Sequence, residues 1–106
     1  MSDEWQEVSV PLPPPGRMAV FEAAGLRLVL CNAGGAPYVV QDRCPHAFAY
    51  LSEGRLEGFV LECPLHGGRF HVPTGRALGG IVTVDVETYP VRVEDDVVLV
   101  RVAAAH

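Results

Sequence analysis

Residues 44–78 read CPHAFAYLSEGRLEGFVLECPLHGGRFHVPTGRAL. The stretch holds two short segments that each contain one cysteine and one histidine. Cys44 and His46 are separated by one residue, Cys63 and His66 by two, and residues 47–62 lie between the segments. Each segment includes a proline, and the second leads directly into a pair of glycines. Two loops of this kind can each present one thiolate and one imidazole to a shared metal site.

These four residues also have an ordinary structural interpretation. A buried cysteine commonly packs as a small hydrophobic residue, and a lone histidine commonly satisfies a local hydrogen bond. The whole chain, however, has only three cysteines and four histidines. Two cysteine–histidine pairs within one short stretch rarely arise by chance in such a composition, and we therefore interpret them as metal ligands.

Zinc accepts the same thiolate and imidazole ligands in a tetrahedral site, so a zinc-stabilised interaction module is one alternative. Zinc-finger motifs usually place two cysteines before two histidines, and each pair closes its own loop. Here cysteine and histidine alternate along the chain. A Rieske [2Fe-2S] centre accounts for the alternation, because two histidines replace two cysteines on one of its irons and one loop can supply both irons. The sequence therefore predicts a protein that transfers electrons.

Together with TYPVRVEDDVVLV at residues 88–100, this stretch resembles the Rieske-type [2Fe-2S] ferredoxins of the soluble bacterial kind. The resemblance covers nearly the whole chain. It implies that Cys44 and Cys63 bind the inner iron and that His46 and His66 bind the outer, more exposed one. It also implies a carrier, not an enzyme, in the breakdown of aromatic compounds. Single electrons would pass from an NAD(P)H-dependent flavin reductase to a terminal ring-hydroxylating oxygenase.

A small Rieske-like subunit of a nitrite reductase is the second alternative. Some of those subunits have lost the cluster ligands, whereas this chain keeps all four. The sequence has no nucleotide-binding fingerprint, no flavin site and no motif of two histidines and one carboxylate for an oxygenase iron. The ferredoxin interpretation is therefore favoured over an enzymatic one.

Short strand-forming runs separated by turn residues make up the rest of the chain. The expected strands are 7–10, 17–22, 26–31, 38–41, 59–62, 69–72, 89–93 and 97–102. Turns of hairpins are expected at 33–36 and 94–96. The proline-rich segment 11–16 is expected to be a rigid connection, with a proline-rich ligand for a partner domain as the alternative. Residues 51–58 are too short and too rich in glycine for a stable helix, and predict a turn or short hairpin.

The predicted fold is therefore all-β, a small antiparallel β domain, and the resemblance implies that its base is a small antiparallel β-sandwich. The resemblance adds a cluster-binding subdomain at about residues 42–72, inserted between strands of one Rieske domain that spans residues 1–106. A chain of 11.4 kDa buries roughly 65% of its extended-chain surface on folding, which is enough for one modest core. Because the ligands come from two loops, the cluster should also stabilise the fold.

Charge and cysteine content restrict partners and location. The 8 basic residues, all arginines, are outnumbered by 13 acidic ones, and no basic run suited to a nucleic-acid backbone is present. Cys31 is left after the ligands and lies in an apolar run, where a buried, unreactive thiol and no disulfide are expected. The sequence shows no signal peptide and no apolar run of about 18 residues. We expect a cytoplasmic protein without a membrane anchor, and a monomer because it must expose its cluster to two partners in turn.

The resemblance also bears on the reduction potential. High-potential relatives have a serine and a tyrosine hydroxyl that donate hydrogen bonds to the cluster sulfurs, at positions that correspond here to Gly68 and Phe70. They also have one extra cysteine in each loop, where this chain has Ala49 and Leu65. Because lost hydrogen bonds disfavour the added electron, we expect a potential in the lower part of the roughly −150 to +300 mV Rieske range.

Several neighbouring residues carry weaker predictions. Phe48, Tyr50 and Phe70 are candidates for an apolar rim that contacts partners, with core packing as the alternative. His71 is expected to lie on the surface of a strand and not to be a fifth ligand. Related ferredoxins commonly have prolines in a third loop over the cluster, but residues 78–84 contain none, so we expect a more mobile cover.

Overall fold

A computed structural model of the chain describes residues 5–45, 48–65, 67–79 and 84–102. These residues form eleven β-strands and one three-residue 3-10 helix, η1 (Leu51–Glu53). All strand pairs are antiparallel. The predicted all-β fold class is thus confirmed. Nowhere in this described part does a helix have the length and hydropathy of a membrane span.

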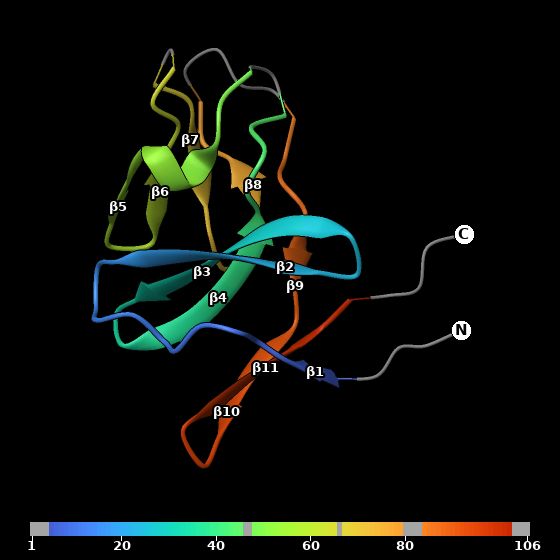
Figure 1. Ribbon diagram of the computed structural model, residues 1–106. Coiled ribbons are helices and arrows are strands. Elements are labelled where there is room, and N and C mark those ends of the chain that lie inside the picture. The colour runs from blue at the N-terminus through green and yellow to red at the C-terminus, as the bar shows by residue number, and fades with distance from the viewer. Residues whose placement is uncertain (1–4, 46–47, 66, 80–83, 103–106) are drawn as a thin grey trace.

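The strands form three sheets, stacked as shown in Figure 1. The middle sheet has the order β2 (Met18–Ala23), β3 (Leu26–Ala33), β4 (Ala36–Gln41) and β9 (Thr88–Tyr89). The lower sheet has the order β1 (Trp5–Glu7), β11 (Val97–Arg101) and β10 (Val91–Glu94). The upper sheet has the order β5 (Arg55–Glu57), β6 (Val60–Glu62), β7 (Arg69–His71) and β8 (Arg76–Ala77).

The upper sheet is an insertion in the middle sheet. Strands β4 and β9 pair directly with each other, although the whole of β5–β8 lies between them in the sequence. This arrangement agrees with the predicted insertion. The strands of the upper sheet extend to Ala77, and the boundary of about 42–72 for the cluster-binding subdomain stays a prediction.

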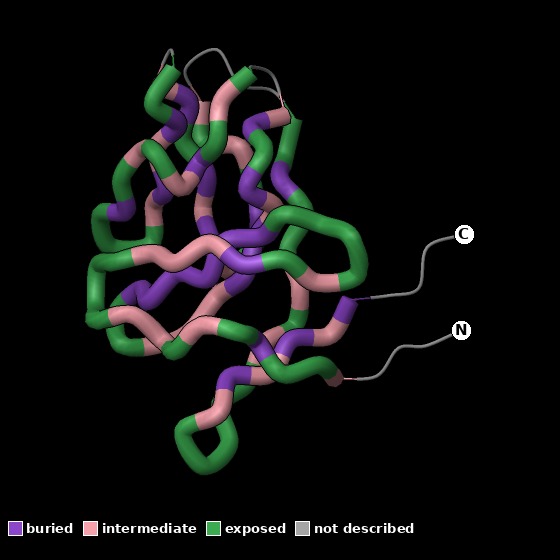
Figure 2. The backbone as a smooth tube through the Cα atoms, viewed as in Figure 1, coloured by how far each residue is buried: buried purple, intermediate pink, exposed green. Residues whose placement is uncertain are grey.

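The middle sheet is covered on both faces, and β3 shows this most clearly. Successive side chains of a strand point to opposite faces. Val29 and Cys31 of β3 belong to one buried cluster, whereas Leu28 and Leu30 belong to another. Both faces of β3 are therefore apolar, which explains why its sequence reads as a continuous hydrophobic run. In Figure 2 the buried stretches gather where the sheets meet, whereas the β10–β11 turn is exposed.

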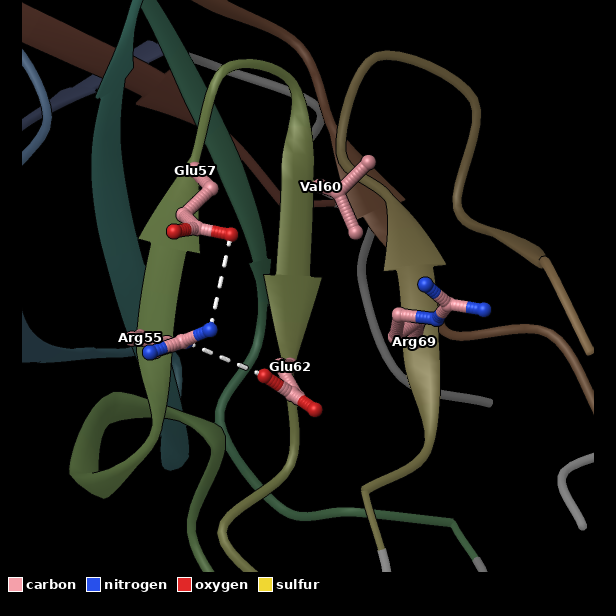
Figure 3. A pocket seen from close by; sticks show the side chains of 5 residues that line it. All are labelled: Arg55, Glu57, Val60, Glu62 and Arg69. Carbon is pink, nitrogen blue, oxygen red and sulfur yellow. Dashed lines mark hydrogen bonds and ion pairs between the residues drawn. The ribbon is translucent and has the colours of Figure 1, made fainter. Parts of the chain in front are cut away.

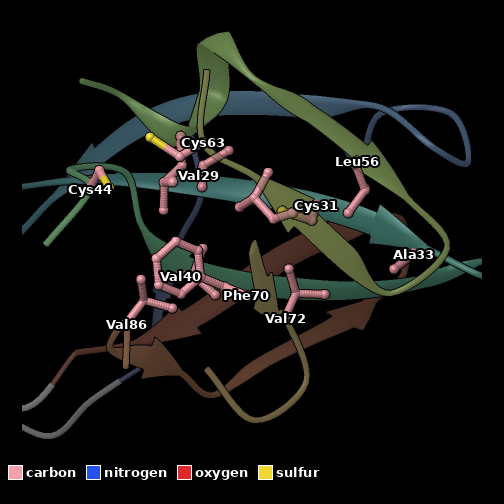
Figure 4. Packing of buried hydrophobic residues seen from close by; sticks show 12 residues of the cluster. Val29, Cys31, Ala33, Val40, Cys44, Leu56, Cys63, Phe70, Val72 and Val86 are labelled. Carbon is pink, nitrogen blue, oxygen red and sulfur yellow. The ribbon is translucent and has the colours of Figure 1, made fainter. Parts of the chain in front are cut away.

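The two clusters are named here by their position. The upper core, drawn in Figure 4, consists of Val29, Cys31, Ala33, Val40, Cys44, Leu51, Leu56, Leu61, Cys63, Phe70, Val72 and Val86. The lower core consists of Val8, Phe21, Leu28, Leu30, Val39, Val98, Val100 and Val102.

Both predicted hairpin turns are confirmed. Ala33 pairs with Ala36, and Gly34 and Gly35 between them have φ angles of 65° and 87°. Two successive positive φ angles are typical of the type I′ turn that matches the twist of paired strands. Asp95 and Asp96 adopt the same region without glycine, with φ angles of 52° and 68°.

The proline-rich segment is held against β3. The Asn32 side-chain amide donates a hydrogen bond to the Pro13 carbonyl oxygen at 2.8 Å, and the Gly16 N–H donates to the Asn32 carbonyl oxygen at 2.8 Å. These contacts agree with a rigid connection between β1 and β2.

The structure differs from the sequence predictions mainly in short elements. Strand β1 lies at Trp5–Glu7 and not at 7–10, because antiparallel pairing of Trp5 with Arg101 sets its position. Residues 51–58 divide into η1 and β5. Strand β8 was not predicted, since two residues are too few to show a periodic pattern and it depends on pairing with β7.

Candidate metal centre

The two predicted ligand segments lie on loops at one end of the molecule. The first loop, residues 42–50, connects β4 to η1, and the second loop, residues 63–68, connects β6 to β7. Figure 1 shows the described parts of both loops together above the upper sheet. The antiparallel pairing of β6 with β7 places the two ends of the second loop side by side.

Cys44 and Cys63 meet at the base of these loops. Both belong to the upper core, with exposed fractions of 2% and 1%. The two thiols lie close enough for Cys44 to raise the pKa of the Cys63 thiol, yet neither cysteine is in a disulfide. Figure 4 shows them apart from Cys31, which lies deeper along β3. The structure thus brings together the two predicted cysteine ligands and separates the third cysteine from them.

His46 and His66, the other two predicted ligands, lie outside the described residues. Among the described residues, no group of three or more His, Cys, Asp or Glu side chains is placed to hold a metal ion. The full set of Cys44, His46, Cys63 and His66 therefore stays a prediction, and the cysteine pair is its described half.

Backbone hydrogen bonds close each loop just below its cysteine. The Cys44 N–H donates to the Ala49 carbonyl oxygen at 3.0 Å, and the Cys63 N–H donates to the Gly68 carbonyl oxygen at 2.7 Å. These bonds fix the backbone position of each cysteine in its loop, in the way that a preformed ligand site requires.

Electrostatics at the site favour the neutral form of the Cys63 thiol. Burial raises the pKa of the Cys63 thiol, and the neighbouring Cys44 raises it further, whereas the Leu65 N–H lowers it. Two adjacent buried thiolates without a counter-charge are unfavourable, but iron or zinc supplies that charge and deprotonates its ligands. Two neighbouring, buried thiols outside any disulfide, with the Leu65 N–H favouring negative charge on one of them, fit the cysteine half of an iron–sulfur cluster.

One charged residue beside the site was not singled out from the sequence. Asp42 opens the first loop and is 0% exposed. Its carboxylate accepts hydrogen bonds from Arg27 on β3 and from Ser52 of η1. In the sequence Asp42 stands between Gln41 and Arg43, and such a polar context predicts an exposed side chain. Only the folded contacts reveal that it is buried.

The predicted apolar rim is only partly present. Phe48 is 92% exposed and Tyr50 is 37% exposed, so both face solvent near the first loop. Phe70, by contrast, is completely buried in the upper core, which was the alternative considered for it. The guanidinium of Arg43 lies 5.0 Å from the ring centre of Phe48. The third loop is only partly described, because residues 80–83 lie outside the described ranges.

His71 and Cys31 agree with their structural interpretations. The Nδ1 atom of His71 lies 2.9 Å from the hydroxyl oxygen of Thr74, on β7 and the turn that follows it. Cys31 is fully buried on β3, and burial raises the pKa of its thiol to about 12. Such a thiol is almost entirely protonated at neutral pH and should be unreactive.

A row of charged residues crosses the upper sheet below the second loop. Arg55 forms ion pairs with Glu62 at 3.1 Å and Glu57 at 3.6 Å. Arg69 lies opposite Glu62 in the register of β6 and β7, with no ion pair among the described residues. With Val60 these residues line a pocket of about 240 Å³, shown in Figure 3.

Comparison with known proteins also indicates an iron–sulfur centre. The family profile described as the Rieske [2Fe-2S] domain matches residues 5–90. The chain is 40% identical to the ferredoxin component of the naphthalene 1,2-dioxygenase system of Pseudomonas aeruginosa, over 94% of this chain and 97% of the relative. It is 44% identical to the ferredoxin component of biphenyl 2,3-dioxygenase of Rhodococcus jostii strain RHA1, over 81% of this chain and 80% of the relative.

Solved structures with the same fold include ferredoxins of similar size. The complex of reduced oxygenase and oxidised ferredoxin in carbazole 1,9a-dioxygenase contains a chain that matches with a TM-score of 0.86 and 34% identity, covering 94% of both chains. The ferredoxin of Sphingomonas yanoikuyae B1 matches with a TM-score of 0.85 and 27% identity, covering 94% of this chain and 100% of that one.

Proposed function

The chain belongs to the Rieske [2Fe-2S] domain family, and from this premise we propose how it carries electrons and which residues hold its cofactor. Its cofactor is a Rieske-type [2Fe-2S] cluster, and its function is that of the ferredoxin component of an aromatic-ring dioxygenase system. It is an electron carrier to the oxygenase and not the catalytic component.

Cys44, His46, Cys63 and His66 are the proposed ligands. One observation carries this assignment: the thiols of Cys44 and Cys63, from separate loops, are neighbours in the upper core without forming a disulfide. His46 and His66 complete the set because each follows its cysteine within the same loop. When bound, the cluster supplies one-electron redox chemistry.

The described residues perform two tasks for this cluster. The buried position of both cysteines keeps water away from the thiolate side, and the Leu65 N–H stabilises negative charge on the sulfur of Cys63. The loops themselves lie at the end of the molecule, and they include the exposed side chains of Phe48 and Leu65. A partner can therefore approach this end without disturbing the core.

The electron donor, the oligomeric state and the compartment belong to the proposal as well. We expect an NAD(P)H-dependent flavin reductase to reduce the protein, a monomeric carrier to pass the electron to the terminal oxygenase, and both steps to occur in the cytoplasm. The support is chemical: a carrier that meets two partners in turn is simplest as a monomer, and three free cysteines suit a reducing compartment.

Spectroscopy of the purified protein tests the cofactor and its ligands. After anaerobic loading with iron and sulfide, we expect a coloured protein that gives the rhombic EPR signal of a Rieske centre when reduced. Stopped-flow mixing of the reduced protein with the oxygenase of a naphthalene dioxygenase system should then reoxidise it. A colourless protein that binds one zinc ion instead would contradict the proposal. Retention of the Rieske signal after His46→Ala or His66→Ala would refute the ligand assignment.

A further inference from the structure

A buried carboxylate closes the first loop from below. Asp42 is 0% exposed, and with Asn32 it makes up the buried polar residues among the described part of the chain. Its Oδ2 atom accepts from the Arg27 Nε–H at 2.6 Å and from the Ser52 hydroxyl at 3.0 Å, and its Oδ1 accepts from the Ser52 N–H at 2.8 Å. Both carboxylate oxygens are therefore engaged.

The backbone of Asp42 makes two further hydrogen bonds. Its carbonyl oxygen accepts from the Leu51 N–H at 2.6 Å, and its N–H donates to the Arg27 carbonyl oxygen at 3.1 Å. A single residue thus joins β3, the start of the first loop, and the helix η1 that follows the loop. The two ends of the loop are connected to each other and to the middle sheet through Asp42.

These contacts lie directly beneath the cysteine of the loop. Above Asp42, Arg43 and Tyr50 form an isolated antiparallel bridge, and the Cys44 N–H bonds to the Ala49 carbonyl oxygen. Arg27 reaches both strands of this short ladder, because its guanidinium contacts the Asp42 carboxylate and also lies 4.0 Å from the ring centre of Tyr50. Arg27 therefore holds the loop from the side of β3.

The chemistry of the contacts requires a carboxylate. All three side-chain partners of Asp42 are donors, and a carboxylate is the side chain that only accepts. An asparagine of the same shape would have to direct an NH2 group at either Arg27 or Ser52. It would also leave the positive charge of Arg27 without its partner.

We propose that Asp42 is a positioning residue for the cluster and that Arg27 is its counter-ion. The Arg27–Asp42–Ser52 contact holds Cys44 at its place beside Cys63, and the paired charges contribute no net charge next to the cluster. This inference rests on the proposed function, since it takes Cys44 as a ligand. Removal of either charge should alter the reduction equilibrium, because a nearby positive charge favours the added electron and a negative charge opposes it.

The two single charge removals therefore have opposite expected effects. Asp42→Asn leaves Arg27 unpaired and should raise the midpoint potential, whereas Arg27→Gln leaves the buried carboxylate and should lower it. We expect a threefold to tenfold change in the reduction equilibrium constant, where tenfold corresponds to about 59 mV for one electron. The double variant Arg27→Gln/Asp42→Asn should return toward the wild-type potential.

A matched control is available in the lower sheet. Arg92 and Glu94 of β10 form an ion pair at 3.0 Å, and Glu94→Gln and Arg92→Gln change the net charge by the same amounts. These variants should leave the potential and the EPR spectrum unchanged. A control shift as large as that of Asp42→Asn would overturn the inference, because it would reflect overall charge only.

Two further measurements distinguish a positioning role of Asp42 from a contribution to the stability of the fold alone. In Asp42→Asn the EPR line shape should change, and hydrogen exchange of the Leu51 and Ser52 amides should speed up. Ser52→Ala, which keeps the charge, should speed up exchange with little change in potential. If Asp42→Asn folds but fails to retain the cluster, positioning is supported and Arg27→Gln then tests the charge effect. Potential shifts of the same sign in both charge variants would overturn that effect.

Failure of this inference and failure of the proposed function give different results. A wild-type protein that shows no Rieske signal would remove the proposed function. A wild-type protein with the signal, together with an Asp42→Asn variant of identical potential, line shape and amide exchange, would remove only the role of Asp42.

Discussion

The lower core and the upper core are built from the same middle sheet but completed in different ways. Every member of the lower core is Val, Leu or Phe, contributed by the lower and middle sheets or by segments next to them. The upper core includes three cysteines, and two of them lie on loops. Hydrophobic burial alone completes the lower core, whereas the upper core ends at Cys44 and Cys63, the proposed thiolate ligands of the cluster.

This difference suggests that the two halves of the molecule are stabilised in different ways. Strands β3 and β4 supply side chains to both cores, so the middle sheet is common to the two halves of the molecule. The upper sheet consists of strands of two or three residues, which bury little surface by themselves. We therefore expect the upper half to depend on the cluster and the lower half to be independent of it.

The largest expected effect comes from exchanging the cysteines of the upper core one at a time. Cys63→Ser should abolish the Rieske EPR signal and electron transfer to the oxygenase, because it removes a proposed thiolate ligand. Cys31→Ala is the matched control, since Cys31 is equally buried but lies on β3 away from the loops. Iron content and EPR after anaerobic loading provide the measurement. Equal cluster loss in both variants would contradict the ligand assignment.

Removal of the cluster should affect the two halves unequally. We expect the apo protein to lose about 5 kcal/mol or more of stability, which corresponds to a fall in melting temperature of roughly 20–40 °C. Hydrogen exchange should speed up in β5–β8, while β3, β4 and β11 stay protected. Calorimetry and hydrogen-exchange mass spectrometry of holo and apo protein test this. Equal melting temperatures would show that metal binding and folding are not coupled.

A pair of leucine truncations compares the cores directly. Leu61 in the upper core and Leu30 in the lower core are both 0% exposed, and each change to alanine should cost about 2–5 kcal/mol. Only Leu61→Ala should also accelerate release of the cluster, since Leu61 precedes Cys63 by two residues on β6. The rate of bleaching of the visible absorption under a chelator measures this. Similar bleaching rates would indicate that the two cores unfold as one unit.

A smaller change is expected from restoring a missing hydrogen-bond donor. Phe70→Tyr introduces a hydroxyl at the position where high-potential relatives have one, and should raise the midpoint potential from a wild-type value below zero. We expect about a tenfold change in the reduction equilibrium constant, which is about 59 mV. Tyr38→Phe removes a hydroxyl elsewhere and serves as the control. A wild-type midpoint potential well above zero in a redox titration would contradict the expectation that the missing donors keep the potential low.

The last prediction concerns the third cysteine, and its effect is small until the pH exceeds 9. The folded pKa of Cys31 is raised from its usual 9.0 to about 12, so the folded state holds the proton more tightly than the unfolded chain. Its contribution to stability is fully present below pH 9 and is lost between pH 9 and 12, by about 1.4 kcal/mol per pH unit. Urea unfolding at pH 8 and pH 10, with Cys31→Ala as control, should show this loss only in wild type.

Some of these features follow from local sequence and others do not. The runs at 26–31 and 38–41 predict strands because their residues favour extended structure, and the glycines at 34 and 35 predict the turn between them. The cysteine–histidine spacing predicts a metal centre because the ligand types and their order restrict the chemistry. Strand β8 and helix η1 could not be predicted, since both depend on contacts with distant segments.

Asp42 and Phe70 are two residues near the site whose burial was not evident from the sequence. From sequence Phe70 was as suitable for a rim as for a core, and only its complete burial in the upper core separates the two. Asp42 reads as an ordinary surface carboxylate, because its partners Arg27 and Ser52 are 15 and 10 residues away.

The order and spacing of four ligand-type residues indicated the cofactor, the strand-forming runs indicated the all-β fold class, and the resemblance to Rieske-type ferredoxins implied the carrier function. The cofactor and the fold class depend on ligand chemistry and on local backbone preference, and short segments of sequence determine both. The face that each side chain occupies, the meeting of Cys44 with Cys63 and the burial of Asp42 were settled only when three sheets packed together. Burial and long-range hydrogen bonds are properties of the whole packed chain, and no short segment contains them.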